Sequence, residues 1–245
     1  MAPSSTIRTR LASAKVEDQP DRSLSTENAV RIGLRRRQRL ALQQGGPEHV
    51  FIVESGCLTL DTVLPGNRRQ VALVLYAGDM IAKSAAPPVP QVGLTAMLPS
   101  MVARLRIDDT CGTDLTGLGA ATARLAARSS LHTIAIGRLT GEERIATLFL
   151  EMALYLGKPT PGGWSFEIPL SRSDMADYMA LNPDTLSRLV SRLRASGLIT
   201  MPTRSRATVK DLSALEELTP LAQSLRMLRD GVATYPAGNR NTPMP

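Results

Sequence analysis

The chain has 245 residues, a formal net charge of +7 and a pI near 10.0, and 43% of its residues are hydrophobic. This length is enough for one large or two modest domains with real cores, and the basic balance suits a polyanionic partner. No apolar run approaches the ~18 residues of a membrane span, and the first 24 residues lack the apolar core of a signal peptide. We therefore expect a cytoplasmic protein with no membrane partner.

Few residues are suited to metal binding or catalysis. Cys57 and Cys111 form no C-x-x-C pair, so we expect neither a metal site nor an iron–sulfur cluster. The sequence has no phosphate-binding loop, no G-x-S-x-G motif and no grouping of His, Asp and a nucleophile, so we expect no enzyme. His49 and His132 are the only histidines. Haem ligation or pH sensing by a histidine, and oxidation of a cysteine, stay open.

The first half of the chain has the pattern of a sheet domain. Residues 1–24 are polar and without periodicity, which indicates a flexible tail. Within 25–114, apolar β-formers at 50–53, 57–64 and 71–76 are separated by Gly-containing turns, which predicts an antiparallel β-roll. We expect an α+β protein whose N-terminal domain is this roll.

A long helix is predicted over residues 115–139. Apolar or bulky side chains recur every seven residues, and a second set follows four positions after the first three, which is the pattern of a coiled-coil seam. The predicted dimer interface is formed by Leu118, Thr122, Leu125, Ser129, His132 and Ile136. Packing of this seam on the roll of its own chain is the alternative.

Residues 140–212 predict a winged helix-turn-helix. Thr140 with Glu143 forms a capping box that starts one helix, and Ser171 with Asp174 forms another. A short turn then leads to a helix with Asn182 as N-cap, Pro183 at its first position and Gly197 beyond its end. The basic segment after Gly197 alternates as a β-hairpin, which would be the wing. This region carries the charge excess, because 158–210 has eight Lys or Arg against four Asp or Glu.

The helix that begins after Asn182 has two opposed faces. Leu186, Leu189, Val190 and Leu193 share one side, and Asp184, Ser187, Arg188 and Ser191 share the other. An arginine can donate to guanine O6 and N7, a carboxylate can accept from cytosine N4, and a hydroxyl suits either base. The polar face is therefore predicted to read DNA.

These residues resemble the C-terminal domain of Crp/Fnr transcription regulators, most closely the Fnr and FixK branch. The recognition helix of that branch has the pattern Glu-x-x-Ser-Arg, and the matching residues here are Asp184, Ser187 and Arg188. The Asp184 side chain is one methylene shorter than the Glu of the pattern. Arg172 matches an arginine that contacts the DNA backbone. Ala180 stands where the family has a turn glycine, so a positive φ there would be strained by a Cβ.

The N-terminal domain resembles the cyclic-nucleotide-binding roll of the same family, and the whole resemblance covers about residues 25–212. Relatives that bind cyclic AMP have Gly-Glu-Leu after a strand, and an Arg-Ser or Arg-Thr pair nearby. This chain has Ala82-Lys83-Ser84 there, and no arginine follows until Arg104. A lysine cannot accept a hydrogen bond from a ribose hydroxyl. We therefore expect no cyclic AMP binding in the usual mode, and the effector is unknown.

The resemblance implies a bacterial regulator that binds double-stranded DNA as a homodimer at an inverted repeat with TTGA-like half-sites, and contacts RNA polymerase as an activator. Base contacts fall to Asp184, Ser187 and Arg188. Backbone contacts fall to Arg172, Ser191, Arg192, Arg204 and Arg206. Two alternatives are a regulator without an effector, controlled by its abundance, and a ligand-binding protein whose winged module contacts other proteins. Residues 213–245 are predicted to be a tail with one short helix.

Overall fold

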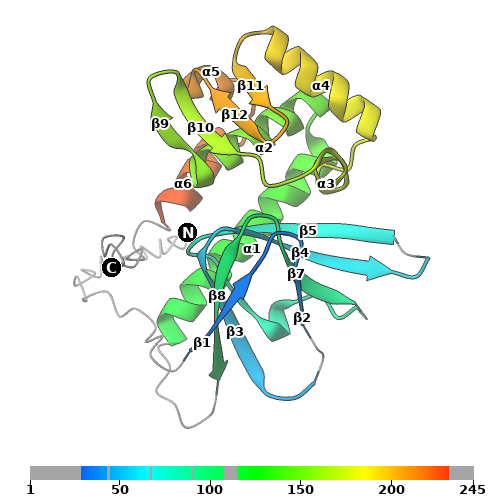
Figure 1. Ribbon diagram of the computed structural model, residues 1–245, viewed down its shortest axis with the longest axis vertical. Helices are drawn as coiled ribbons and strands as arrows, with labels where there is room; N and C mark the ends of the chain where they lie inside the picture. The colour runs from blue at the N-terminus through cyan, green and yellow to red at the C-terminus, as the bar shows by residue number, and fades with distance from the viewer. Residues whose placement is uncertain (1–28, 43–44, 67, 90, 108–114, 232–245) are drawn as a thin grey trace, which may run out of the picture.

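The computed structural model describes residues 29–42, 45–66, 68–89, 91–107 and 115–231. The predicted flexible tail at 1–24 and Cys111 lie outside these ranges. Figure 1 shows a β-roll and a helical module with its own small sheet, with helix α1 (Leu115–Arg138) running from one to the other. The predicted α+β architecture is confirmed.

The roll is built from two antiparallel four-stranded sheets, with strand orders β1-β8-β3-β6 and β2-β7-β4-β5. Its strands are β1 (Val30–Leu34), β2 (Arg39–Ala41), β3 (Glu48–Ser55), β4 (Cys57–Leu64), β5 (Arg68–Tyr76), β6 (Met80–Ala82), β7 (Val92–Ala96) and β8 (Ser100–Ile107). A 3₁₀ turn, η1 (Lys83–Ala85), follows β6. The two sheets enclose an apolar core that includes Phe51, Leu58 and Leu75. The predicted strands at 50–53, 57–64 and 71–76 all fall within β3, β4 and β5.

Gly56 joins β3 directly to β4 and shows why the roll needs a glycine there. Its φ is +90°, and a Cβ at this position would lie 2.5 Å from the carbonyl oxygen of Pro99. Both the left-handed backbone and the close approach exclude other residues. The chain can therefore pass from one sheet of the roll to the other through a single connecting residue.

Helices α1 and α2 (Gly141–Leu156) form the frame between the roll and the second module. The predicted capping box at Thr140 and Glu143 is present and starts α2. Ten consecutive residues of α2, from Ile145 to Leu154, are buried. Cys57, Val74 and Tyr76 of the roll join the same apolar core, so roll and helical module pack continuously.

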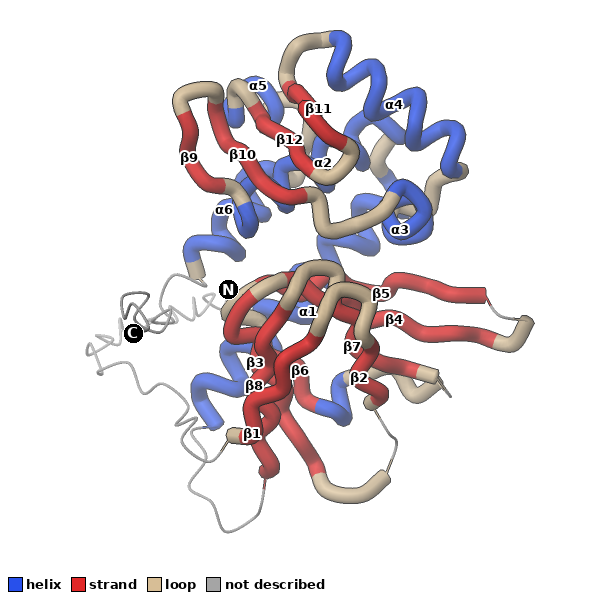
Figure 2. Tube along the Cα trace, in the orientation of Figure 1, coloured by secondary structure: helices blue, strands red, loops and turns tan. Residues whose placement is uncertain are grey.

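The winged helix-turn-helix is confirmed at its predicted positions. Helix α3 (Arg172–Tyr178) begins at the Ser171 capping box, helix α4 (Pro183–Ala195) follows, and β11 (Ile199–Thr203) pairs with β12 (Arg206–Val209) as the wing. Strands β9 (Lys158–Thr160) and β10 (Gly163–Glu167) were not predicted. They extend the wing to a sheet of order β11-β12-β10-β9, which Figure 2 shows beside α4.

The last described elements are α5 (Leu212–Glu216) and α6 (Ala222–Asp230). The Thr219 hydroxyl lies 2.7 Å from that of Thr147 in the core and accepts a hydrogen bond from the Leu221 N–H at 3.3 Å, just before α6. Helix α6 packs against α1 and α2, and Leu225 is buried. This part of the expected tail therefore belongs to the folded module. No helix among the described residues is long and apolar enough to cross a membrane.

Candidate nucleic-acid interface

Both ends of helix α4 have the capping residues from which the sequence predicted this helix. The Asn182 side-chain oxygen accepts a hydrogen bond from the Asp184 backbone N–H at 2.9 Å, and Pro183 occupies the first turn. Gly197 has a φ of +79°, which is the left-handed conformation that ends helices. Asp184 in the first turn and Arg192 and Arg194 in the last also suit the helix dipole.

The two faces of α4 are separated as the sequence predicted. Leu186, Leu189, Val190 and Leu193 are buried against the module. Asp184, Ser187, Arg188 and Ser191 are all exposed. Within the described part of the chain, the Arg188 side chain has no hydrogen-bond or ion-pair partner. Its five donors are therefore available to an external acceptor.

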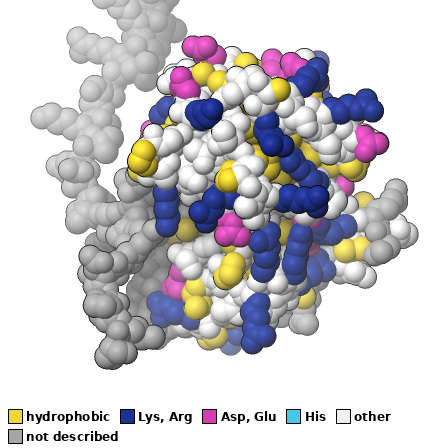
Figure 3. Space-filling model, turned by 45° about the horizontal axis from the view of Figure 1, so that its top comes forward, with side chains coloured by type: hydrophobic (Ala, Val, Ile, Leu, Met, Phe, Trp, Pro, Cys, Tyr) yellow, Lys and Arg dark blue, Asp and Glu magenta, His cyan; other side chains and the backbone are white. Residues whose placement is uncertain are grey.

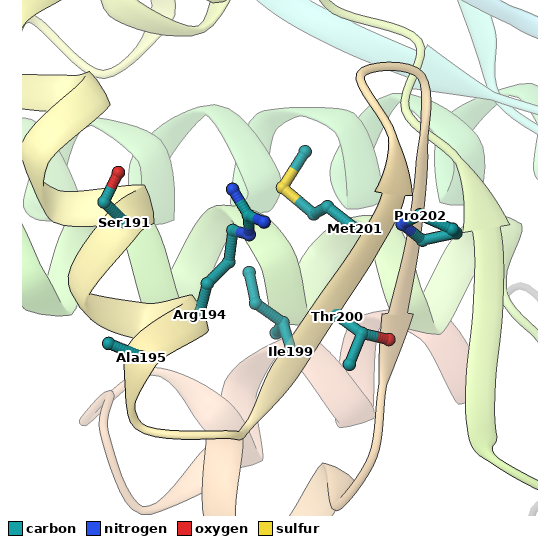
Figure 4. A pocket seen from close by; sticks show the side chains of 7 residues that line it. All are labelled: Ser191, Arg194, Ala195, Ile199, Thr200, Met201 and Pro202. Atoms are coloured by element: carbon teal, nitrogen blue, oxygen red, sulfur yellow. The ribbon is translucent and has the colours of Figure 1, made fainter.

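A groove of about 540 Å³ lies between the C-terminal half of α4 and the wing strand β11 (Figure 4). Its lining residues are Ser191, Arg194, Ala195, Ile199, Thr200, Met201 and Pro202. The Arg194 guanidinium extends into this groove beside Met201. Arg194 was not among the predicted contact residues.

Arg172 approaches the same region from α3. Its Nη2 donates to the Met201 sulfur at 3.7 Å, and its Nη1 is buried without a hydrogen-bond partner among the residues that the structure describes. Burial and the positive charge of Arg194 both lower the pKa of Arg172. Two like charges with an unsatisfied donor favour an anionic ligand here. A duplex phosphate has the matching chemistry.

The wing presents two more arginines. Arg204 occupies the turn between β11 and β12, Arg206 begins β12, and both are exposed. Neither side chain is paired with a carboxylate within the described residues. Arg192 differs, because it forms an exposed ion pair with Glu142 at 3.0 Å. Exposed pairs of this kind contribute little stability and exchange readily.

The turn between α3 and α4 carries the strain that its sequence suggested. Ala180 has a φ of +50°, a left-handed conformation that a Cβ disfavours. The Arg144 guanidinium of α2 donates to the carbonyl oxygens of Met179 and Ala180 at 3.1 and 3.3 Å. This long-range contact fixes the turn and was not predicted from the sequence.

Asp174 couples the helix-turn-helix to the roll. Its carboxylate caps α3 through Ser171 and also pairs with Arg37 at 2.9 Å and with Arg69 of β5. Burial opposes the charged form, but the hydrogen bonds from Ser171, Arg37 and Arg69 outweigh it and lower the Asp174 pKa to about 2. The capping role was predicted, and the two arginines, 137 and 105 positions away, were not.

The predicted dimer seam divides between two faces of α1. Leu125 is buried against the roll, Leu118 packs against the same domain, and Ile136 is half-buried. His132 stacks on the Tyr178 ring with a centroid distance of 4.0 Å, and burial lowers its pKa to about 4. Thr122 and Ser129 are exposed. In this structure, the seven-residue repeat of Leu118, Leu125 and His132 therefore marks the side that docks on its own chain.

A buried arginine anchors α1 and was also missed by sequence reasoning. Arg128 is 4% exposed, pairs with Asp79 of the roll and lies 3.2 Å from the Glu151 carboxylate of α2. The rings of Tyr76 and Tyr155 stack on each other with centroids 4.6 Å apart, and each centroid lies about 5 Å from the guanidinium. Buried ion pairs of this kind fix the relative positions of the elements that they join but add little net stability.

The other two candidate sensor residues in the described ranges are Cys57 and His49. Burial raises the pKa of the Cys57 thiol, which disfavours the reactive thiolate. His49 lies near Phe51 and bonds the Pro47 carbonyl oxygen. No group of three His, Cys, Asp or Glu side chains suited to a metal ion occurs within the described ranges.

Comparisons with known proteins agree with this geometry. Residues 143–218 match the family of Crp-like helix-turn-helix domains. The chain is 29% identical over 181 residues to the nitrogen fixation regulation protein FixK of Azorhizobium caulinodans, covering 70% of this chain and 71% of that one. It is 37% identical over 87 residues to the transcriptional activator protein FnrL of Cereibacter sphaeroides, covering 34% and 35% of the two chains.

Solved structures show the same fold over most of the chain. The structure of FixK2 from Bradyrhizobium japonicum superposes with a TM-score of 0.66 at 25% identity, covering 78% of this chain and 97% of that one. A CRP-family transcriptional regulator from Thermus thermophilus gives a TM-score of 0.64 at 22% identity, covering 77% and 95%.

The fold and the site together define a DNA-binding transcription regulator with an N-terminal roll and a C-terminal winged helix-turn-helix. The chain is similar to regulators of the Crp/Fnr family, FixK among them, and its residues 143–218 match the Crp-like helix-turn-helix domain.

Proposed function

We propose that a homodimer of this chain binds an inverted repeat in double-stranded DNA and activates transcription by contacting RNA polymerase. The observation that carries the proposal is the exposed face of α4, where Arg188 has no partner among the described residues while the opposite face is buried. A short helix with this division can enter the major groove with its apolar side still anchored. The names of the relatives support an activator.

Roles follow from chemistry and position. Arg188 reads guanine, Asp184 accepts from a cytosine on the partner strand, and Ser187 contacts a neighbouring base. Phosphates are contacted by Arg172, Ser191, Arg192, Arg204 and Arg206, which position the protein without reading sequence. The half-sites are TTGA-like. The identity of the base that Asp184 contacts depends on the shorter reach of this side chain compared with glutamate.

The dimer forms through the exposed side of α1. Gly119, Thr122, Ala126, Ser129 and Thr133 follow one another at spacings of three or four residues, and all five are exposed. Small side chains allow two helices to approach closely. This face keeps Thr122 and Ser129 of the first prediction and leaves out Leu118, Leu125, His132 and Ile136.

We infer that the roll does not hold cyclic AMP in the usual mode. Lys83 donates to the carbonyl oxygens of Gly45, Gly46 and Pro47 at 2.7, 3.2 and 2.6 Å. The position where relatives present a carboxylate to the ribose is thus filled by a cation that bonds its own loop. A ribose hydroxyl has no acceptor in this side chain.

The proposal is tested by incubating the purified full chain with a random pool of duplexes and sequencing those that it retains. Light scattering then measures the mass of the complex. We expect one inverted repeat to be enriched, with half-site centres about 34 Å apart, and two chains per duplex. Adding cyclic AMP should leave the affinity unchanged. Retention without any sequence preference would reject DNA reading and favour the alternative of a module for protein contacts.

A further inference from the structure

Helix α6 packs on the place where the roll is joined to the DNA-binding module. It follows the stretch that matches the Crp-like domain, which ends at residue 218. Helix α6 contacts both α1 and α2. Helix α1 leads from the roll, and α2 belongs to the DNA-binding module, as Figure 1 shows. One short helix therefore contacts both sides of the connection between α1 and α2, which we call the junction and define as residues 139–141.

The backbone of the junction does not by itself fix the angle between α1 and α2. Helix α1 ends at Arg138 and α2 begins at Gly141. Between them, Thr140 is extended, with a φ of −65° and a ψ of 163°. Each non-helical residue has two soft backbone dihedrals, so a connection this short can still bend. Side-chain contacts must therefore hold the angle that the structure shows.

Two leucines attach α6 to the junction. Leu221, directly before α6, is 8% exposed and forms an apolar cluster with Ala135 and Leu139 at the end of α1. Leu225, one turn farther along, is 4% exposed and belongs to the core that α2 shares with the helix-turn-helix. Burial of both side chains is favourable only while α1 and α2 keep their positions. Successive turns of one helix thus hold α1 and α2 together.

A buried pair of hydroxyl groups holds the start of α6 on α2. The hydroxyl oxygens of Thr147 and Thr219 lie 2.7 Å apart, and both side chains are 4% exposed. The Thr147 hydroxyl donates to the Glu143 carbonyl oxygen at 2.7 Å, so Thr219 is the donor of the pair. Buried hydroxyl groups are costly to leave without partners. This bond therefore resists a displacement of α6 from α2.

Helices α1, α2 and α3 meet around a small cavity of about 20 Å³ that α6 completes. Arg128, Glu151 and Tyr178 contribute to its wall from these three helices, and Leu221 and Leu225 contribute from the α6 side. A cavity of this size holds about one water molecule. Displacement of α6 would therefore open the meeting point of the three helices to solvent.

The junction is coupled directly to the recognition helix α4. A Cβ on Gly141 would lie 2.9 Å from a methyl carbon of Leu189 in α4, so α2 and α4 are in close contact. The Arg144 guanidinium donates to the Leu139 carbonyl oxygen at 2.9 Å and to that of Ala180, in the turn before α4, at 3.3 Å. The position of α4 therefore follows the angle at the junction. Figure 3 shows Lys and Arg side chains on the surfaces of both modules, so the same angle also shapes the basic surface.

We propose that α6 is a brace that fixes the angle between α1 and α2, and that it thereby sets the half-site spacing that the dimer accepts. This inference rests on the proposed function and extends it from base contacts to spacing. In the proposed dimer the two α1 helices pair, and each α4 is positioned by its own junction, so a fixed angle presents the recognition helices at one separation. A preorganised pair of helices also binds more tightly, because less ordering is needed on binding.

The test measures affinities for duplexes that carry the selected repeat with its half-site centres about one or two base pairs closer together or farther apart. The brace variant is Leu221→Ala/Leu225→Ala. Met227→Ala is the matched control, because Met227 lies on α6 and is 64% exposed. If the brace variant holds the required angle in about one molecule in ten, its affinity for the selected spacing falls about tenfold. We expect the wild type to bind only the selected spacing tightly, and the brace variant to bind all spacings about equally and a single half-site as the wild type does.

Thr219→Val is a second variant, which keeps the side-chain volume and removes the hydroxyl that bonds Thr147. It should change the spacing preference in the same direction with a smaller loss of affinity, about threefold. Circular dichroism and sedimentation velocity measure whether each variant is folded and dimeric. If the double variant does not fold, Thr219→Val alone decides.

Three results would overturn the brace: the spacing preference of the wild type in both variants, the same change in Met227→Ala, or tighter binding by the variants. Tighter binding would mean that α6 holds α4 away from DNA. Arg188→Ala tests the proposed function separately, because it should lose discrimination at one base pair and keep the spacing preference. If Arg188→Ala changes neither, the proposed function fails. An unchanged spacing preference of the α6 variants beside a sensitive Arg188→Ala rejects only the brace.

Discussion

The Asp174 carboxylate of α3 and the Arg69 guanidinium of β5 form an ion pair that joins the helix-turn-helix to the roll. Arg69 also holds Asp61 of β4 at 3.0 Å, and Asp61 in turn lies 3.0 Å from Arg39. The series of alternating charges thus runs from the edge strand β2 of one roll sheet, through β4 and β5, to helix α3 of the helix-turn-helix. Asp174 is its end and also completes the capping box that Ser171 begins at the start of that helix.

Asp174→Asn should lower the free energy of unfolding by about 2 kcal/mol at neutral pH, because the folded state holds the carboxyl pKa near 2 instead of its ordinary value of 3.8. The side chain is 3% exposed, so solvent screening is small. A depressed carboxyl pKa stabilises above the unfolded value, and this contribution disappears as pH falls from about 4 to 2. Urea unfolding measures it, with exposed Asp177→Asn on the same helix as the control. An equal effect of both variants would contradict the assignment.

His132→Phe should remove a pH dependence of stability while keeping the stack on Tyr178. Burial lowers the His132 pKa from 6.5 to about 4, so the unfolded chain binds the proton first as pH falls. Stability should therefore rise with pH between 4 and 6.5, by at most about 1.4 kcal/mol per pH unit from this group. Arg128, Glu151 and Tyr178 line the same small cavity, and the first two are paired.

Unfolding free energies of the wild type and His132→Phe at pH 4.5 and 7 measure this contribution. The window lies above that of Asp174, so the two effects can be separated in one titration. The same change with pH in both proteins would exclude His132 as its source.

Ala180→Gly should raise the free energy of unfolding by about 1 kcal/mol, since φ of +50° strains a residue with a Cβ. Ala195→Gly is the matched control in ordinary helical backbone at the end of α4, where glycine should cost about 0.5 to 1 kcal/mol. Thermal unfolding of both variants gives the comparison. Destabilisation by Ala180→Gly would show that the turn does not strain the alanine.

Ala126→Arg and Leu125→Ala should separate the two faces of α1. Ala126 is exposed on the small-residue face, so an arginine there should yield a monomer in sedimentation velocity. Leu125 is 8% exposed and packs on the roll, so its truncation should cost about 2 to 4 kcal/mol of stability and leave the dimer mass. A dimeric Ala126→Arg protein would place the interface elsewhere.

The elements that the sequence predicted best are those fixed by local chemistry. Thr140 with Glu143, Ser171 with Asp174, and Asn182 with Pro183 each cap the helix that they predicted. The β9–β10 hairpin was missed although Pro161-Gly162-Gly163 is a turn signal. Trp164, Phe166 and Ile168 alternate after it, and this short pattern was overlooked.

The contacts that sequence could not predict join residues far apart in the chain. Asp174 meets Arg69 across 105 positions, and Arg128 meets Asp79 across 49. The faces of α1 were assigned from a heptad pattern, which identifies bulky positions but not the partner that covers them. Docking on the roll and the stack on Tyr178 decide that Leu125 and His132 face inward.

Binding of Arg188→Ala to the selected duplex and to single base-pair variants of it tests the central claim most directly. Exposed Arg204→Ala of the wing is the comparison. Arg188→Ala should cost about 1 to 3 kcal/mol and lose discrimination at one base pair per half-site, whereas Arg204→Ala should weaken all duplexes alike and reduce the salt slope by about 1. If Arg188→Ala retains the full preference of the wild type at every position, the α4 face does not read the sequence.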